Sequence, residues 1–324
     1  MKICIIGCGA IGSTLLMYLY NHFDITVVVR DYERKHSIIR EGMKIISYVE
    51  KRKTVIRPKV ITKDDIKNYS EELYDIIFIA VKAYDIEEAL RIAKLLSSEN
   101  TCVVTLQNGL GVYDLAIDVF KQNAIHGIVT FGAYRKSLNE VIMTSKGGII
   151  LGSRYASNCV NMVYNVLKRT GLDVRVVDNI DSWIWLKLLI NAAINPMTAI
   201  LRVKNRSIVE DHNLYRIATA VIKEGIEVAK CINIVLPIDP LELLKNIARE
   251  TGENISSMLQ DVLRCSKTEI EFINGAIVRL GKKCGISTPL NEMLYSMIKY
   301  LESRCHKEEV MMNAPFVKSD IAMI

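Results

Sequence analysis

The stretch that decides the fold stands at the start of the chain, where residues 1–13 read MKICIIGCGAIGS. Lys2–Ile6 is a short apolar run typical of a buried strand, and Ala10–His22 has the apolar spacing of a helix. The turn between them fits G-x-G-x-x-G, in which the first glycine permits a tight turn, the second lets the backbone approach a pyrophosphate and the third allows close packing of helix on strand. The helix N-terminus adds free N–H groups and the positive end of the helix dipole. The pattern predicts a dinucleotide site whose contacts are Gly7, Cys8, Gly9, Ala10, Ile11 and Gly12.

The residue after the second strand indicates which nicotinamide cofactor binds. Ile25–Val29 predicts that strand, and Arg30 follows it directly. An NAD site usually carries Asp or Glu at this point, whereas arginine suits the 2′-phosphate of NADP through forked, charge-assisted hydrogen bonds. Asp31 comes next and leaves NADH open, and Arg30 as a plain surface charge is the alternative interpretation. We therefore predict NADPH, with NADH possible.

The rest of the first half alternates between strands and helices. Ile76–Val81 and Cys102–Leu106 are buried-type strands, each followed by a helix-like stretch, and Leu172–Val177 is a final strand. The glycines of residues 127–152 and the alternation within them predict added antiparallel strands. Continuous apolar strands separated by helices are typical of a parallel sheet covered on both faces. We predict an α/β fold with a doubly wound, Rossmann-type domain over residues 1–178.

Beyond residue 178 the strand signal disappears. Helical periodicity predicts an all-α domain over residues 179–324, in which residues 306–324 have no clear pattern and are expected to form a tail. The predicted helices are Asp181–Leu201, His212–Cys231, Pro240–Glu250, Ser266–Gly281 and Pro289–Arg304.

Composition excludes several classes of protein. The net charge is +6, but the basic residues are scattered and form no dense patch interleaved with aromatic residues, so we expect no nucleic-acid partner. The N-terminus lacks the features of a signal peptide, and apolar runs such as Asp75–Val81 are far shorter than the roughly 20 residues of a membrane span. We therefore expect a soluble, cytoplasmic protein.

The cysteines and histidines suggest no metal site. The eight cysteines are spread singly without a CxxC pair, so we predict no structural metal and expect buried thiols rather than disulfides. A hyperthermophilic source would weaken the expectation about disulfides. The five histidines fall outside every candidate motif, which argues against a histidine acid–base mechanism.

A polar stripe marks the first predicted helix of the second domain. Lys187, Asn191 and Asn195 are spaced i, i+4 and i+8, so on a helix they lie along one side among apolar neighbours. A protonated lysine can give a proton to the oxygen of a ketone that is being reduced, and its charge stabilises the developing oxyanion. The spacing alone leaves a structural, ion-paired lysine equally open. Pro196 predicts that the helix kinks or ends at Asn195 and presents that side chain to a cleft.

Glu269 lies in a second candidate segment. Ser266-Lys267-Thr268-Glu269 fits a capping box, in which the glutamate bonds back to the backbone at a helix start. From spacing alone, this structural role is favoured over a place in a functional site.

Several motifs together resemble the 2-dehydropantoate 2-reductase (ketopantoate reductase) family, over about residues 1–304. They occur in the order seen in that family: GCGAIG at 7–12, VKA at 81–83, QNG at 107–109, the Lys187/Asn191/Asn195 stripe, VKN at 203–205, SSMLQD at 256–261 and TEIEFINGAI at 268–277. In that family a Rossmann domain binds NADPH and a helical domain closes the substrate cleft.

The resemblance implies roles for individual residues. Lys187 would be the general acid, and Glu269 would bond the substrate hydroxyl or hold Lys187, close to the cofactor. Lys82 and Asn108 would contact the cofactor near the nicotinamide, and a cofactor contact near Gly132 fits only loosely. The expected substrate contacts are Asn108, Asn191, Asn195, Asn205 and Ser257.

The reaction implied is reduction of 2-dehydropantoate to (R)-pantoate, a precursor of pantothenate and coenzyme A. The partner is then a small 2-keto acid, and a homodimer is the expected assembly. Two alternatives remain: a reductase of another small 2-keto acid, and a non-catalytic NADP-binding sensor, which would not need Lys187, the asparagines, Ser257 and Glu269 together.

Overall fold

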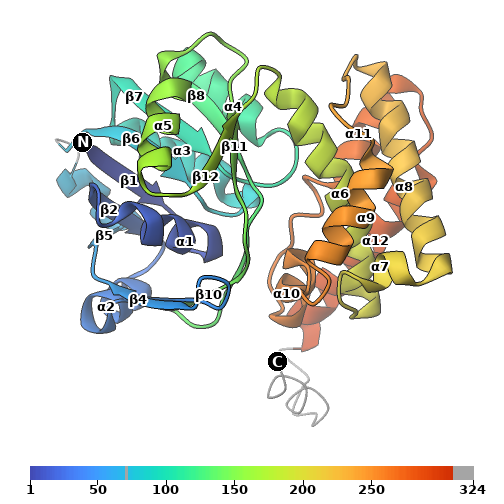
Figure 1. Cartoon of the computed structure of the whole chain (residues 1–324), viewed down its shortest axis with the longest axis horizontal. Helices are drawn as coiled ribbons and strands as arrows, with labels where there is room; N and C mark the ends of the chain where they lie inside the picture. Colours follow the sequence, from blue (N-terminus) through green and yellow to red (C-terminus); the bar gives the residue numbers. More distant parts are fainter. Residues whose placement is uncertain (70–71, 309–324) are drawn as a thin grey trace.

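The computed structural model describes residues 1–69 and 72–308, and within this part of the chain the strands form two sheets (Figure 1). The larger sheet has the order β12-β11-β8-β7-β6-β1-β2-β5, and its neighbours pair in parallel except for the antiparallel pair β8–β11. Its strands are β1 (Lys2–Ile6), β2 (Asp24–Val29), β5 (Lys59–Thr62), β6 (Tyr74–Ile79), β7 (Ser97–Thr105), β8 (Ala124–Val129), β11 (Gly148–Gly152) and β12 (Asp173–Val176). The predicted α/β class is confirmed.

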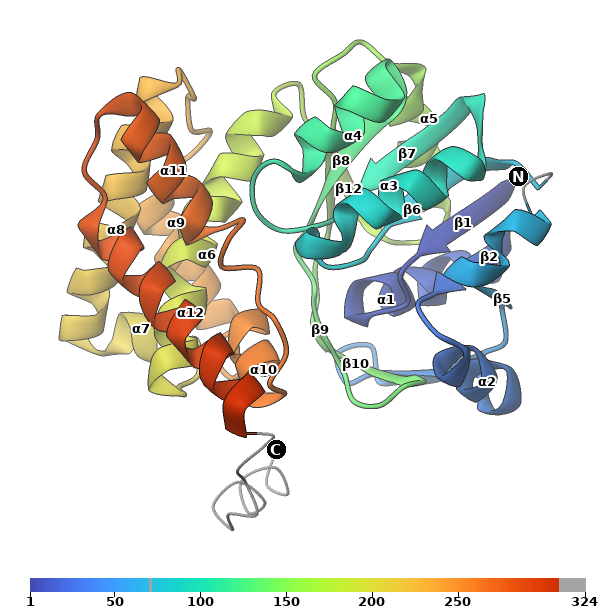
Figure 2. The same cartoon turned by 180° about the vertical axis from the view of Figure 1, so that it is seen from behind.

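Helices cover both faces of this sheet (Figures 1 and 2). Ile3 and Ile5 of β1 pack in one core with α1 (Ala10–Leu19) and α5 (Asn158–Arg169), whereas Cys4 and Ile6 pack in the other core with α3 (Ile86–Leu95) and α4 (Val112–Phe120). Successive side chains of a strand point to opposite faces, so a strand buried on both sides must be apolar throughout. That is why β1 shows no polar alternation.

A smaller sheet, β4-β3-β10-β9, packs on α1. It joins β3 (Met43–Ser47) and β4 (Arg52–Ile56) to β9 (Gly132–Arg135) and β10 (Glu140–Ser145). The antiparallel strands expected within residues 127–152 are confirmed by β8–β11 and β9–β10. The sequence interpretation did not include β3, β4 and β5, nor α2 (Tyr32–Glu41). β4 and α2 are largely exposed, which dilutes their apolar signal.

The sheet part, β1 to β12, is followed by a helical part, which confirms the all-α second half. Its helices are α6 (Ile180–Leu201), α7 (Ser207–Glu210), α8 (His212–Cys231), α9 (Pro240–Glu250), α10 (Ser257–Leu263), α11 (Asn274–Cys284) and α12 (Pro289–Glu308). The expected helix Ser266–Gly281 is wrong in its first half, because α11 begins at Asn274. Residue 178 falls between β12 and α6, and we keep it as the proposed domain boundary. Of the expected tail, residues 309–324 lie outside the described residues.

Helix α6 does not end at Asn195, so of the two predicted outcomes, a kink or an end, the end is wrong. The helix runs through Pro196 to Leu201. Proline has no N–H for the carbonyl of Ala192 four residues back, and the buried side chain of Asn274 donates to that oxygen instead, at 3.0 Å. A partner from α11 therefore replaces the missing helical bond.

The same helix is long and apolar enough to cross a membrane by length and composition, a feature that the sequence interpretation overlooked. Its most apolar window is 78% buried inside the protein. Burial against α8, α9, α10 and α12 is the mark of a core helix.

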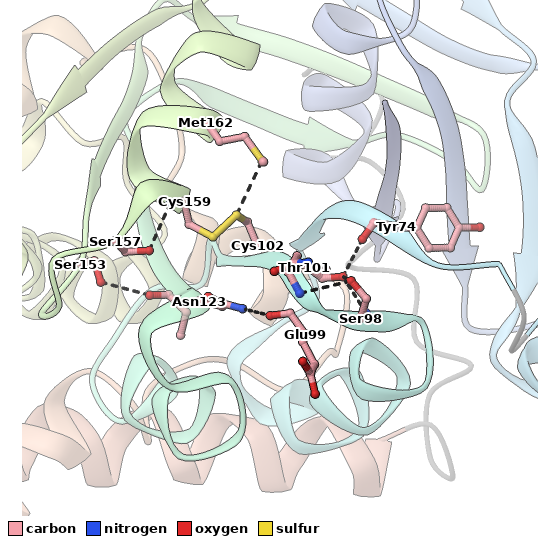
Figure 3. The surroundings of a disulfide bond; sticks show 12 residues. Tyr74, Ser98, Glu99, Thr101, Cys102, Asn123, Ser153, Ser157, Cys159 and Met162 are labelled. Atoms are coloured by element: carbon pink, nitrogen blue, oxygen red, sulfur yellow. Dashed lines mark hydrogen bonds between the residues drawn. A yellow bond between two sulfur atoms is a disulfide. The ribbon is translucent and has the colours of Figure 1, made fainter.

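Two disulfides correct the expectation of buried thiols for four cysteines, whereas Cys4 and Cys8 are buried thiols as expected. Cys102 of β7 is bonded to Cys159 of α5, with the Cα atoms 5.5 Å apart (Figure 3). Cys231 is bonded to Cys284 across the ends of α8 and α11, with the Cα atoms 6.3 Å apart. Both separations lie within the span of a disulfide. The partners are 57 and 53 residues apart in sequence, so only the tertiary fold brings them together.

We predict that these disulfides stabilise the protein strongly. Closing loops of this length removes unfolded-state entropy worth about 4 kcal/mol per bond, which corresponds to a loss of roughly 10 °C in melting temperature per disulfide removed. Thermal unfolding of Cys102→Ser/Cys159→Ser and Cys231→Ser/Cys284→Ser measures this. Cys265→Ser, at an exposed free cysteine, is the matched control and should melt like the wild type. Double variants that melt with the control would contradict the assignment.

Candidate active site

The candidate site lies at one edge of the larger sheet, where the parallel strands β8, β7, β6, β1 and β2 all end. The order of the strands switches sides at β1, because β2 and β5 are added on one side of it and β6, β7 and β8 on the other. Crevices at such switch points are where open α/β sheets bind ligands. The glycine loop, Arg30, Lys82 and Asn108, all predicted cofactor contacts, follow the ends of β1, β2, β6 and β7.

The glycine loop after β1 has the geometry that the motif requires. Gly7 has φ +97°, and a Cβ there would stand 2.8 Å from the backbone nitrogen of Val81. A Cβ on Gly12 would stand 2.0 Å from the carbonyl oxygen of Gly7, so this glycine lets α1 pack on the loop. Gly9 caps α1 without a side-chain bond, and the nearest atom to a Cβ there is 4.0 Å away. The loop thus leaves the α1 N-terminus open to an anion.

A cavity of about 510 Å³ extends from this loop to the helical part. Predicted site residues in its lining are Gly7, Cys8, Gly9, Ala10, Ile11, Arg30, Lys82, Asn108, Ser257 and Glu269. Gly12 lies buried beneath the loop. Residues from β1, β2, β6 and β7 therefore share one cavity with α10 and the segment that follows it.

Asp31 is used structurally at this cavity. Its carboxylate accepts the backbone N–H of Arg34 at 2.8 Å and caps α2. Arg30 forms an ion pair with Asp85 and is largely exposed. The cap gives Asp31 a structural role that needs no cofactor.

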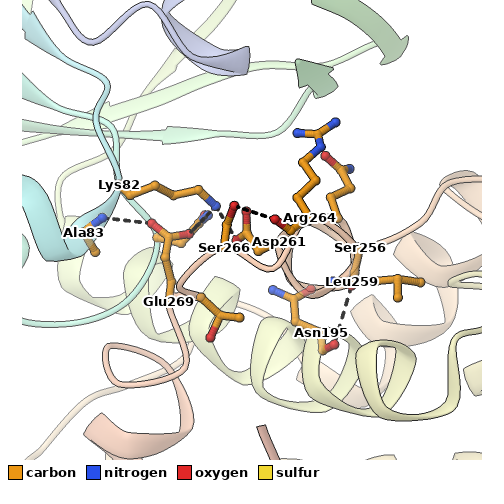
Figure 4. Close-up of polar contacts among 12 residues, drawn as sticks. Lys82, Ala83, Asn195, Ser256, Leu259, Asp261, Arg264, Ser266 and Glu269 are labelled. Carbon is orange, nitrogen blue, oxygen red and sulfur yellow. Dashed lines mark hydrogen bonds and ion pairs between the residues drawn. The ribbon is translucent and has the colours of Figure 1, made fainter. Parts of the chain in front are cut away.

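Glu269 joins the two parts of the protein. One carboxylate oxygen accepts the backbone N–H of Ala83 at 3.0 Å (Figure 4), and the other accepts a hydrogen bond from the side-chain amide of Asn108 at 3.1 Å. Glu269 is buried, and no helix begins beside it. The capping box suggested by the spacing is therefore wrong, and the carboxylate faces the ends of β6 and β7.

Lys82 makes the second link. Its ammonium lies 2.6 Å from the carboxylate of Asp261 in α10 and 3.9 Å from that of Glu269 (Figure 4). Burial lowers the pKa of Lys82, but the two carboxylates outweigh burial and hold it above its usual value. Burial raises the pKa of Asp261 to about 6, opposed by Lys82.

The pKa of Lys187 is shifted toward the neutral range. Lys187 is half-buried in α6, and its ammonium donates to the carbonyl of Val129 at the end of β8, at 2.7 Å. Burial lowers the pKa of Lys187 to about 8, and the charge of Glu269 pulls it upward. A lysine whose pKa is near 8 can both hold and release a proton under physiological conditions.

The other predicted residues divide into two groups. Ser257 is exposed and lines the cavity, whereas Lys187, Asn191, Asn195 and Asn205 are not part of its lining. Asn195 and Asn205 are buried. The side-chain amide of Asn205 donates to the hydroxyl of Thr251 at 3.0 Å, while its side-chain oxygen Oδ1 has no hydrogen-bond partner among the described residues. Gly132 lies just beyond the lining and donates to the hydroxyl of Ser145 at 2.8 Å.

Sequence reasoning missed charged residues of the cavity, namely Arg34, Arg135, Asp261 and Arg264. Asp261 is the last residue of the SSMLQD motif, and its place in so specific a motif could have indicated that it belongs to the site. Arg135 and Arg264 stand 129 residues apart, and nothing in the sequence connects them.

Comparison with known proteins decides the family. The model described as ketopantoate reductase PanE/ApbA matches residues 3–155, and the model of its C-terminal region matches residues 179–302. A 2-dehydropantoate 2-reductase from Pyrococcus abyssi is 34% identical, over 94% of this chain and 98% of its own. The chain belongs to the ketopantoate reductase family. Membership makes it an NAD(P)-dependent oxidoreductase.

Solved structures share its fold. A ternary complex of D-mandelate dehydrogenase with NADH and anilino(oxo)acetate has a TM-score of 0.89 at 24% identity, covering 94% of this chain and 99% of that chain. A dimeric ketopantoate reductase from Staphylococcus aureus has a TM-score of 0.78 at 20% identity, covering 94% and 100%. At these identities the likeness shows the fold alone.

We predict that Asp261→Asn weakens the contact between the two parts. The change leaves the Lys82 ammonium without its nearest carboxylate, which costs about 1–3 kcal/mol for a partly buried charged bond. Melting temperature should fall by several degrees. Glu72→Gln removes the exposed Lys59–Glu72 pair within the sheet part and should change melting little. Equal effects of the two substitutions would contradict a special role for the Lys82–Asp261 bond.

Proposed function

We propose that this protein reduces 2-dehydropantoate (ketopantoate) to (R)-pantoate with NADPH, the reductive step of pantothenate and coenzyme A biosynthesis. The observation that carries the proposal is the cavity in which the glycine loop meets Lys82, Asn108, Ser257 and Glu269. Such a cavity brings a dinucleotide and a small polar substrate within reach of groups from both parts of the protein. Membership of the ketopantoate reductase family supports the choice of substrate.

The residues present fit a dinucleotide. The open α1 N-terminus and the free space beside the backbone of Gly9 suit a pyrophosphate. Arg30, directly after β2, suits a 2′-phosphate. Arg34 lines the same cavity, and its buried Nε atom has no hydrogen-bond partner. NADPH supplies the hydride to the keto carbon when bound. To hold a 2′-phosphate, Arg30 must exchange Asp85 for it.

Lys187 is proposed as the general acid. Its Nζ proton goes to the substrate oxygen as negative charge develops there, and the ammonium charge stabilises that oxygen beforehand. Glu269 favours the protonated form of Lys187 through its charge. Lys187 donates to Val129 and does not line the cavity in this structure, so its ammonium must move to reach a substrate bound there.

The substrate contacts are proposed by motif. Asn108, Asn191, Asn195, Asn205 and Ser257 would hydrogen-bond the carboxylate and hydroxyls of the keto acid without adding charge. Lys82 and Asn108 would lie against the nicotinamide, with Glu269 holding both. The backbone around Gly132 remains a proposed cofactor contact, supported by its neighbour Ala133 in the cavity lining.

The testing experiment follows NADPH oxidation at 340 nm with ketopantoate, beside pyruvate and 2-ketoisovalerate. Ketopantoate is expected to be the best substrate by kcat/KM. Binding of NADPH without turnover of any keto acid would overturn the proposal and favour the sensor. Preferred turnover of another keto acid would retain the mechanism and replace the substrate.

We predict that kcat/KM for ketopantoate falls as pH rises through about 8, the value to which burial lowers the pKa of Lys187. The acid must be protonated, so activity is full below that pKa and approaches a tenfold loss per pH unit above it. Lys187→Ala should lose most of its kcat, about a hundredfold or more, while NADPH binding measured by fluorescence is retained. A flat profile, or an active alanine variant, would contradict the role.

We predict that Arg30 selects NADPH over NADH. Arg30→Ala should raise KM for NADPH roughly tenfold or more, since a charge-assisted bond to phosphate is lost, and leave KM for NADH nearly unchanged. Arg40→Ala, at an exposed arginine in the last turn of α2, serves as the control. A similar rise for both cofactors would show that Arg30 does not read the 2′-phosphate.

We also propose a cytoplasmic homodimer. A dimeric ketopantoate reductase is among the solved structures that share this fold, which supports the assembly. Light scattering coupled to size exclusion tests it, because a 36.6 kDa chain should then elute with twice that mass.

A further inference from the structure

The cations around the cavity fall into two groups. Arg30, Lys63 and Lys82 each pair with a carboxylate, that of Asp85, Glu88 and Asp261 respectively. Arg34, Arg135 and Arg264 line the same cavity, and among the described residues no carboxylate lies within ion-pair distance of them. Guanidinium groups that gather at a cavity without ion-pair partners are suited to bind an anion.

Arg34 places this group beside the glycine loop. It projects from α2, is 7% exposed, and donates through Nη2 to the carbonyl of Cys8 between Gly7 and Gly9. Its Nε is buried without a partner. Such a donor inside a protein normally finds an acceptor, and none comes from the described residues of the chain itself.

Arg135 and Arg264 complete the group, one from each of the two parts of the protein. Arg135 ends β9 in the sheet part, and Arg264 follows α10 in the helical part, donating to the carbonyl of Arg135. Burial and the repulsion of Arg135 lower the pKa of both Arg34 and Arg264. The nearest acids are engaged elsewhere, since Asp31 caps α2 and Asp261 pairs with Lys82.

We propose that Arg34, Arg135 and Arg264 form a binding subsite for the diphosphate of the dinucleotide, additional to the glycine loop and to Arg30. The diphosphate is favoured over the 2′-phosphate because Arg34 bonds the loop at Cys8, whereas Arg30 stands at the end of β2. Two of these arginines come from the sheet part and one from the helical part, so a diphosphate held among them links both parts. This subsite rests on the proposed function, since it assigns a role within the cofactor site.

The test measures the affinity of the full-length protein for two probes, ADP and adenosine 2′-monophosphate. Each probe displaces bound NADPH, and the fluorescence of NADPH reports the displacement. ADP carries the diphosphate without the 2′-phosphate, and the second probe carries the reverse. Arg135→Gln and Arg264→Gln should each weaken ADP about tenfold or more, the loss of one charge-assisted bond, and leave the second probe nearly unchanged. Arg30→Gln should show the opposite pattern.

Controls separate the subsite from general charge and from folding. Arg57→Gln removes an exposed arginine that does not line the cavity and should change neither probe. Arg135 and Arg264 are exposed, so both variants are expected to melt like the wild type. The slope of ADP affinity against salt should also decrease in both variants, because fewer cations face the diphosphate.

The outcomes decide the subsite independently of the substrate. Unchanged ADP affinity in Arg135→Gln and Arg264→Gln would overturn it, as would equal weakening of both probes. Wild-type turnover of ketopantoate is measured in parallel. If ADP weakens as expected while ketopantoate is inert, the subsite stands and only the proposed reaction falls.

Discussion

The carboxylate of Glu269 is the group on which the arrangement of the site depends. It is buried between the sheet part and the helical part, and it accepts one bond from the backbone after β6 and one from Asn108 after β7. A buried carboxylate must be fully hydrogen-bonded, so it fixes the spacing of the two strand ends relative to the helical part. Gly109 adds to this restraint. Its φ is +93°, and it lies so close to the helical part that a Cβ on Gly109 would stand 2.5 Å from the carbonyl oxygen of Phe272.

The same charge sets the chemistry. Lys82 lies close enough to Glu269 and Asp261 to stay protonated, whereas Lys187 shares the influence of Glu269 without an ion pair and has a pKa near 8. Two lysines thus stand at one edge of the sheet with different tasks. One supplies a lasting positive charge, and the other can exchange a proton.

Much of this was predictable from sequence, where local pattern and chemistry agree. The glycine loop of residues 7–12 predicted both the β1–α1 turn and its open helix N-terminus, because each glycine answers a separate steric demand. Helices α8 and α9 begin and end where their periodicity indicated. Motif resemblance placed Asn108, Lys82 and Glu269 in one site, and the structure brings these three together.

The rest depends on contacts between segments distant in sequence. The cap at Ser266–Glu269 was a sound local interpretation, yet bonds from residues more than 160 positions away outweigh it. Pro196 was expected to kink or end helix α6. The side chain of Asn274 in α11 donates to the carbonyl that the proline leaves without its helical bond, and the helix continues. The disulfide partners are likewise joined only by the fold.

A crystal structure of the protein with NADPH and pantoate would show whether one cavity assembles Lys187, Glu269 and the cofactor around the substrate. We expect the ammonium of Lys187 to leave the carbonyl of Val129 and to bond the pantoate hydroxyl at the carbon that received the hydride, with Glu269 beside it. Pantoate bound elsewhere, or Lys187 still on Val129 while another group contacts that hydroxyl, would refute this assignment of the site.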